Sequence, residues 1–166
     1  MSRTPPLRSL RLRRSVLSVP AINARALEKT HSLDCDAVIF DLEDSVAPEK
    51  KAEARDNLKT FFAGPLLEGK ERIIRINSLS SGFGLADLEL IKALSPDAVL
   101  LPKVDEPQDV MAVSDLLAEA YAPEELRIWA MIETPRGVRP DSAIAAAFST
   151  PRGVSIIAQM RNSSGA

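Results

Sequence analysis

The sequence predicts an α/β fold of parallel βαβ units, arranged as part of a (β/α)₈ barrel. Short apolar segments alternate with helical segments at intervals of about 25–35 residues, which is typical of repeated right-handed βαβ units. Polar motifs follow nearly every predicted strand. An open doubly wound sheet concentrates its site at one switch point, whereas a barrel brings all strand carboxyl ends to one mouth. The spread of polar motifs therefore favours the barrel.

The predicted strands are apolar runs bounded by turn residues. The run 37–42 is apolar apart from Asp41 and leads into further acids, as expected of a buried parallel strand. Pro102 directly follows the run 98–101 and ends it. The complete set of predicted strands is 14–20, 37–42, 72–77, 98–101, 127–132 and 154–157.

Helical segments separate these strands. Asn23 is a good N-cap for the first helix, and Pro48 suits the first turn of the second. The complete set of predicted helices is 24–31, 48–62, 84–94, 106–121 and 141–148.

Length and composition exclude several classes of protein. A chain of 166 residues corresponds to one domain, and 45% hydrophobic with 27% charged residues is ordinary globular composition. One cysteine excludes an internal disulfide framework, and one histidine excludes the usual Cys/His zinc site. Only 4% of residues are aromatic, which argues against a nucleic-acid stacking platform. No apolar run is long enough to span a membrane.

Charge is unevenly distributed along the chain. Residues 1–14 hold five arginines, the first acid of the chain is Glu28, and residues 15–166 carry a net charge of −7. An acidic body disfavours nucleic-acid binding. Residues 1–13 form a basic arm, for which a targeting segment is the alternative. The solvated arm is favoured because Pro5 and Pro6 would break an amphipathic helix.

Three carboxylates crowd the end of the second predicted strand, at Asp41, Glu43 and Asp44. Anions placed this close repel each other unless a cation offsets them. One interpretation is a divalent-metal environment or a shell that positions substrate. The other is an acidic loop that leads into a helix N-terminus, where negative charge is favoured.

Three further polar residues follow other predicted strands, and each has two interpretations. Arg75 would hold a substrate carboxylate or form an internal salt bridge with Asp41 or Glu43, because an arginine in a buried strand needs a partner. Glu133 is either a metal ligand or a solvated strand end. Lys103 would neutralise the acids or meet a phosphate, and otherwise is a surface lysine.

Taken in order, these motifs resemble the citrate lyase β-subunit group of the HpcH/HpaI aldolase/citrate lyase family. The resemblance covers about residues 14–152 and is specific because six motifs recur in the right order. The matching segments are RSVLSVP (14–20) and 25–29, DAVIFDLEDSVAP (36–48), RIN (75–77), GLADL (84–88), LPKV (101–104) and IETPRG (132–137).

The resemblance implies a cytoplasmic enzyme, a carbon–carbon lyase that uses Mg²⁺. Its substrate would be a 3-hydroxyacyl thioester, such as a citryl, malyl or citramalyl thioester of CoA or of an acyl carrier protein. Retro-aldol or retro-Claisen cleavage would release an acyl thioester and a keto acid. The resemblance also implies a homo-oligomer with no nucleic-acid or membrane partner.

The family's functional residues map onto this chain by motif. Glu133 would bind the metal, Arg75 the keto-acid carboxylate, and Glu43 with Asp44 a metal-bound water. The catalytic candidates are Arg75, Asp41, Glu43 and Asp44, and the substrate-binding candidates are Arg75, Glu133, Lys103 and Arg25.

The sequence departs from the family pattern at its C-terminal end. A full barrel needs about 250 residues, so the expected fold is an incomplete (β/α)₈ barrel of five to six βα units, over residues 14–152. The family's second metal carboxylate follows the sixth strand, but residues 153–166 contain no acid and do not match the family. A frameshift or truncation is one explanation, and a divergent short paralogue is the other. We expect low or no lyase activity from this chain alone, and the alternative is a non-catalytic remnant or interaction subunit that pairs with a full-length relative.

Overall fold

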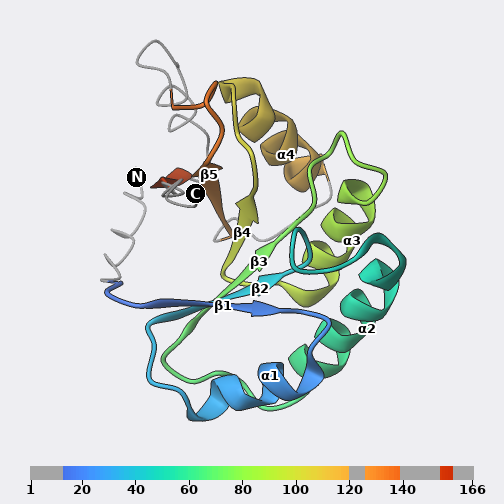
Figure 1. Ribbon diagram of the computed structural model, residues 1–166, viewed down its shortest axis with the longest axis vertical. Coiled ribbons are helices and arrows are strands. Elements are labelled where there is room, and N and C mark those ends of the chain that lie inside the picture. Colours follow the sequence, from blue (N-terminus) through green and yellow to red (C-terminus); the bar gives the residue numbers. More distant parts are fainter. Residues whose placement is uncertain (1–12, 120–125, 139–153, 159–166) are drawn as a thin grey trace, which may run out of the picture.

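A single parallel sheet forms the centre of the protein (Figure 1). The computed structural model describes residues 13–119, 126–138 and 154–158. Strands follow one another across the sheet in chain order, β1-β2-β3-β4-β5-β6. A doubly wound sheet would instead reverse its order at a switch point, so this order confirms the partial barrel. The strands are β1 Val16–Pro20, β2 Ala37–Asp41, β3 Glu71–Arg75, β4 Ala98–Leu101, β5 Arg127–Ile132 and β6 Val154–Ala158.

The described residues form four α-helices. All of them lie on the same face of the curved sheet, where they form an arc around its outside (Figure 1). Asn23 caps the first helix as predicted, because its Oδ1 accepts a hydrogen bond from the Ala26 amide at 3.0 Å. The helices are α1 Ala24–Lys29, α2 Lys51–Phe62, α3 Gly84–Leu94 and α4 Pro107–Glu119, with short 3₁₀ helices η1 Thr30–Ser32 and η2 Pro48–Lys50.

The predicted elements that fall on described residues are confirmed, with small shifts at their ends. The segment expected as a helix over 48–62 opens with the 3₁₀ turn η2 before α2 begins. Strand β3 ends at Arg75, so Asn77 lies in the loop that follows it rather than in the strand. The predicted helix 141–148 and most of the tail 153–166 lie outside the described residues.

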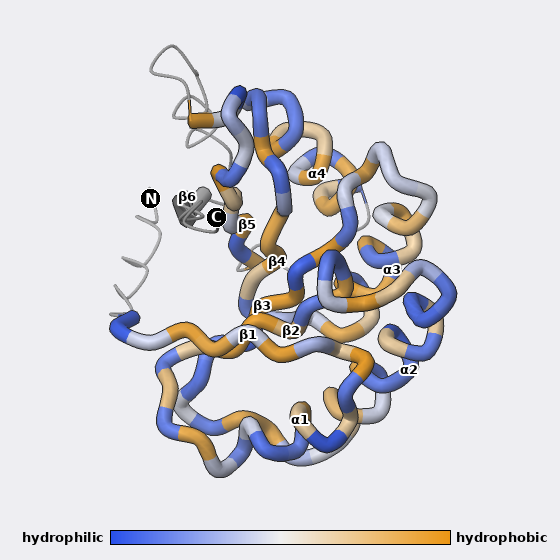
Figure 2. Tube along the Cα trace, viewed as in Figure 1, coloured by the Kyte–Doolittle hydropathy of each residue, from blue (hydrophilic) through white to orange (hydrophobic). Residues whose placement is uncertain are grey.

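Two apolar layers enclose the sheet. The larger lies between the strands and the helices and contains Phe40, Leu58 and Ile74. The smaller lies on the inner face of the sheet and is formed by Ala37, Ile39, Ile73, Ala98, Leu100, Trp129 and Met131. Strand β2 is buried along its whole length, because it contributes to both layers. Orange, apolar segments accordingly run through β1 and β2 in Figure 2.

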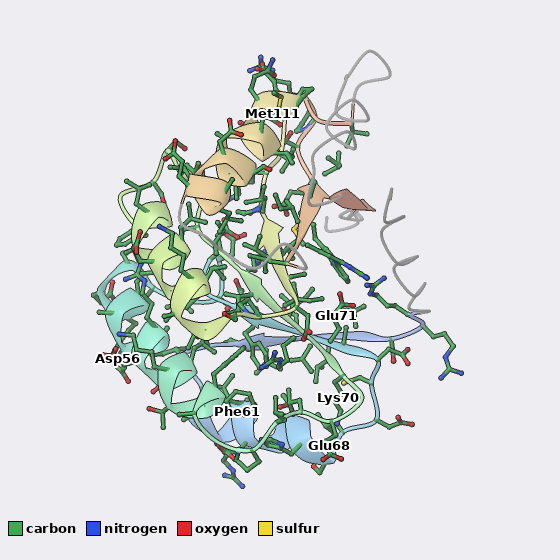
Figure 3. All side chains as sticks on the ribbon, turned by 180° about the vertical axis from the view of Figure 1, so that it is seen from behind. Asp56, Phe61, Glu68, Lys70, Glu71 and Met111 are labelled. Carbon is green, nitrogen blue, oxygen red and sulfur yellow. The ribbon has the colours of Figure 1, made fainter. Side chains whose placement is uncertain are left out.

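The two ends of the inner face carry different groups. Buried Glu71, labelled in Figure 3, lies at the amino ends of the strands. It pairs with Arg13, whose guanidinium lies 5.0 Å from the ring centroid of Trp129. At the carboxyl ends, β2 and β3 finish in register with Asp41 opposite Arg75. Active sites of barrels form at the carboxyl ends of the strands, so this end holds the candidate site.

Candidate active site at the carboxyl ends of the strands

Asp41 and Arg75 form a bidentate ion pair at the mouth of the sheet. Arg75 Nε donates to Asp41 Oδ1 at 2.7 Å, and Nη2 donates to Oδ2 at 2.5 Å. The Asp41 side chain is 2% exposed and that of Arg75 is 12% exposed. The parallel register places both residues last in their strands, so the guanidinium fork meets both carboxylate oxygens directly.

Asp41 also shapes the acidic loop that follows β2. Its Oδ1 accepts a hydrogen bond from the Glu43 amide at 2.8 Å, and its Oδ2 accepts one from the Ser45 amide at 3.2 Å. Burial raises the pKa of Asp41, but the hydrogen bonds from Arg75 and Ser45 outweigh it and hold that pKa below its usual value. Asp41 is therefore a carboxylate at neutral pH, and it folds the loop that presents Glu43.

Glu43 lies between two cations. Its Oε2 is 3.2 Å from Arg75 Nη1, and its Oε1 accepts a hydrogen bond from Lys103 Nζ at 2.5 Å. Among the described residues, Oε2 has no hydrogen-bond donor with good geometry, although the Glu43 side chain is only 8% exposed. Asp44 is more exposed, and its Oδ1 lies 3.3 Å from Lys103 Nζ. The crowded carboxylates are thus offset by Arg75 and Lys103, as their repulsion requires.

Lys103 connects this loop to the end of β5. Its backbone is left-handed, with φ of 52°, which is uncommon for a residue other than glycine. In this conformation the Lys103 amide donates to Glu133 Oε1 at 3.1 Å. A Cβ on Gly137 would lie 2.4 Å from the carbonyl oxygen of Val104. Glycine at this position therefore lets the turn after Glu133 pack on the loop that follows β4.

A buried polar network supports the acidic loop from behind. Lys51 Nζ donates to the carbonyl oxygens of Leu42 and Glu43, both at 2.7 Å. Asn77 Nδ2 donates to the same Leu42 oxygen at 2.9 Å and to Asp87 Oδ2 at 2.7 Å. Burial lowers the pKa of Lys51, although nearby acids, Asp87 first, oppose that shift.

Sequence reasoning missed Lys51 as a functional residue. The available signal was its position, at the start of the helix that follows the acidic loop. Arg55 belongs to the same network, because its Nε donates to Asp87 Oδ1 at 2.7 Å. Asp87 lies in the first turn of α3, where it is fully buried and bonded to Asn77 and Arg55.

The structure brings six of the seven candidate residues together. The contacts given above join Asp41, Glu43, Asp44, Arg75, Lys103 and Glu133. Arg25 is exposed on α1, and within the described ranges its side chain bonds to none of them. Arg75 and Lys103 both form ion pairs with the acids of the site, which was one of the two interpretations given for each.

The carboxylates fit a hydrated hard cation better than a fully protein-bound one. Within residues 13–119, 126–138 and 154–158, no group of three His, Cys, Asp or Glu residues could hold a metal ion. Mg²⁺ commonly keeps several waters and binds through only one or two carboxylates. Glu133 as the one direct ligand, with Glu43 and Asp44 turned to the waters of the ion, would meet that requirement.

The Asp41–Arg75 pair predicts a defined acid sensitivity. Because the pKa of Asp41 in the folded protein lies below 3.8, its contribution to stability is present above pH 3.8 and is lost as the pH falls below that value. We expect the free energies of unfolding of the wild type and Asp41→Asn to converge as the pH drops from 6 towards 3. Urea titrations across this range check the prediction. A difference that stays constant would contradict it.

None of the helices in the described part of the chain is long and apolar enough to cross a bilayer.

Comparison with protein families and curated proteins gives a consistent result. Residues 14–159 match the family model of HpcH/HpaI aldolase/citrate lyase. The chain is 42% identical over 133 residues to (3S)-malyl-CoA thioesterase of Cereibacter sphaeroides (strain KD131 / KCTC 12085), covering 80% of this chain and 45% of that protein. It is 36% identical over 157 residues to citrate lyase subunit beta of Escherichia coli (strain K12), covering 92% and 52%. The chain therefore spans about half the length of these relatives.

Solved structures give the same relationship. The chain matches protein CitE from Mycobacterium tuberculosis, in complex with magnesium, acetoacetate and coenzyme A, with a TM-score of 0.70 and 26% identity. That match covers 95% of this chain and 57% of CitE. A citrate lyase beta subunit from M. tuberculosis, complexed with oxaloacetate and magnesium, matches with a TM-score of 0.64 and 27% identity, over 86% and 56% of the two chains.

Proposed function

Because the chain belongs to the HpcH/HpaI aldolase/citrate lyase family, we propose that it forms part of a Mg²⁺-dependent carbon–carbon lyase. Residues 14–152 would supply the catalytic barrel domain. The observation that carries this proposal is the meeting of Glu43, Arg75, Lys103 and Glu133 at the carboxyl ends of four strands. Magnesium and keto acids occupy the related M. tuberculosis proteins, which supports both a metal and a keto-acid product.

The proposed substrate is a 3-hydroxyacyl thioester of CoA or of an acyl carrier protein. Relatives include (3S)-malyl-CoA thioesterase, citrate lyase subunit beta and the citramalyl-CoA lyase of Rattus norvegicus, which is 40% identical over 105 residues. Their names share a hydroxy acid that carries a second carboxylate. Retro-aldol or retro-Claisen cleavage of such a thioester gives an acyl thioester and a keto acid.

Each residue of the site has a distinct part in this reaction. When bound, Mg²⁺ would polarise the oxygens of the hydroxy or keto acid and offset the charge that develops on cleavage. Glu133 would hold the ion directly, and Glu43 with Asp44 would accept hydrogen bonds from its waters. Arg75 commits Nε and Nη2 to Asp41, and its Nη1, which lies 3.2 Å from Glu43 Oε2, would be the donor for a substrate carboxylate. Asp41 acts by orienting Arg75 and the acidic loop.

A product assay tests the proposed function. The purified protein is incubated with malyl-, citramalyl- or citryl-CoA, with Mg²⁺ or with EDTA. We expect glyoxylate, pyruvate or oxaloacetate to appear together with acetyl-CoA, and only when Mg²⁺ is present. Free thiol is measured in parallel, because hydrolysis would release CoA without cleaving the carbon–carbon bond. Thiol release without a keto acid would favour a thioesterase. Neither product would favour the non-catalytic subunit and overturn the lyase.

A further inference from the structure

Lys103 contacts the oxygens that a divalent cation would need. Its ammonium lies 2.5 Å from Glu43 Oε1 and 3.3 Å from Asp44 Oδ1, and its amide donates to Glu133. One residue therefore touches every carboxylate of the site except Asp41, whose charge is already paired with Arg75.

The backbone of Lys103 makes this double contact possible. Its φ of 52° is strained for a side-chain-bearing residue, and such strain persists where the surrounding structure requires it. Here the left-handed turn directs the amide to Glu133 while the side chain extends to Glu43 and Asp44. The conformation thus joins the acidic loop after β2 to the end of β5.

The ammonium is also free to leave. The Lys103 side chain is half exposed, whereas that of Glu43 is almost fully buried. Departure of the ammonium would open no apolar core, since the stem already meets solvent. A lysine amine is charged at neutral pH, and through these contacts it offsets the acids.

We propose that the Lys103 ammonium is an internal counter-ion, which a bound divalent cation displaces from Glu43 and Asp44. Without the ion, the ammonium limits repulsion among the carboxylates. With the ion at Glu133, its waters would take the hydrogen bonds of Glu43 and Asp44. The two neighbouring positive charges repel each other, and the lysine moves into solvent or to an anionic group of the substrate. This inference rests on the metal requirement of the proposed function.

Metal affinity gives the first test. Calorimetric titration with Mg²⁺ compares the wild type with Lys103→Met, which removes the charge and keeps the length of the apolar stem. We expect the variant to bind Mg²⁺ at least tenfold more tightly, because the ion no longer competes with an ammonium. Lys50→Met is the matched control, since Lys50 pairs with exposed Glu53 in a different part of the surface. Unchanged or weaker binding by Lys103→Met would overturn the proposal.

Chemical labelling of the wild type gives the second test and needs no variant. Limiting acetic anhydride is applied with and without saturating Mg²⁺, and acetylation of each lysine is measured by mass spectrometry. We expect Lys103 to react several-fold faster when Mg²⁺ is bound, while Lys50 and Lys59 do not change. Mg²⁺ binding with no change at Lys103 overturns this inference alone. A wild type that binds no Mg²⁺ overturns the proposed metal requirement as well.

Discussion

Replacement of Arg75 by methionine is expected to destabilise the protein by about 3–5 kcal/mol, because it leaves a buried carboxylate without its partner. The Asp41 side chain is 2% exposed, and the two shortest hydrogen bonds that it accepts come from the Arg75 guanidinium. The two backbone amides that also donate to Asp41 cannot replace a full positive charge. Chemical denaturation at pH 7 measures the loss.

Two further variants separate the effect of losing the ion pair from the effect of changing the size of the side chain. Arg75→Lys keeps a charge but loses the planar fork, so we expect it to recover only part of the stability. Asp41→Asn combined with Arg75→Met removes both charges and should cost less than the sum of the two single changes. A loss below about 1 kcal/mol for Arg75→Met would contradict the pairing, because that is the range of exposed ion pairs.

This pairing changes how an activity loss at Arg75 should be interpreted. Asp41 folds the loop that presents Glu43, so removal of Arg75 disturbs the acidic loop as well as any substrate carboxylate. Arg75 was given two alternative roles from the sequence, and the geometry allows both at once. Its Nε and Nη2 serve Asp41, whereas Nη1 faces Glu43 and the site.

The fold could be predicted from the sequence because its signals are local. Continuous apolar runs, Asn23 at a helix start and Pro102 after a strand each mark an element without knowledge of its neighbours. The choice between barrel and open sheet was harder, because it depends on strand order. Strand order is a non-local property. In the sequence it was indicated only indirectly, by the polar motifs that follow nearly every predicted strand.

The site could be predicted only in part, because its contacts also depend on non-local register. Asp41 and Arg75 are 34 positions apart and meet because β2 and β3 end in register. The left-handed backbone at Lys103 could not be predicted, because the sequence has no glycine at that position. Lys51 resembles an ordinary surface lysine in the sequence, yet it is buried beneath two loop carbonyls.

The change Glu133→Gln is expected to abolish stabilisation of the protein by Mg²⁺. A ligand present at 100 times its Kd stabilises the folded state by about 2.7 kcal/mol, and this gain should be absent from the variant. The physical reason is that Mg²⁺ prefers anionic oxygen, which the amide of glutamine does not supply. Thermal and urea unfolding with and without Mg²⁺ measure the difference.

Glutamine is the informative replacement because it separates charge from shape. Its Oε1 can still accept the hydrogen bond from the Lys103 amide, so the loop contact after β4 should survive. Alanine would remove the charge and this contact together. Glu89→Gln, on an exposed i,i+3 pair of α3, is the control for loss of one negative charge. If Glu133→Gln kept the full Mg²⁺ response, the ion would have to bind elsewhere, and Glu43 with Asp44 would become its ligands in place of Glu133.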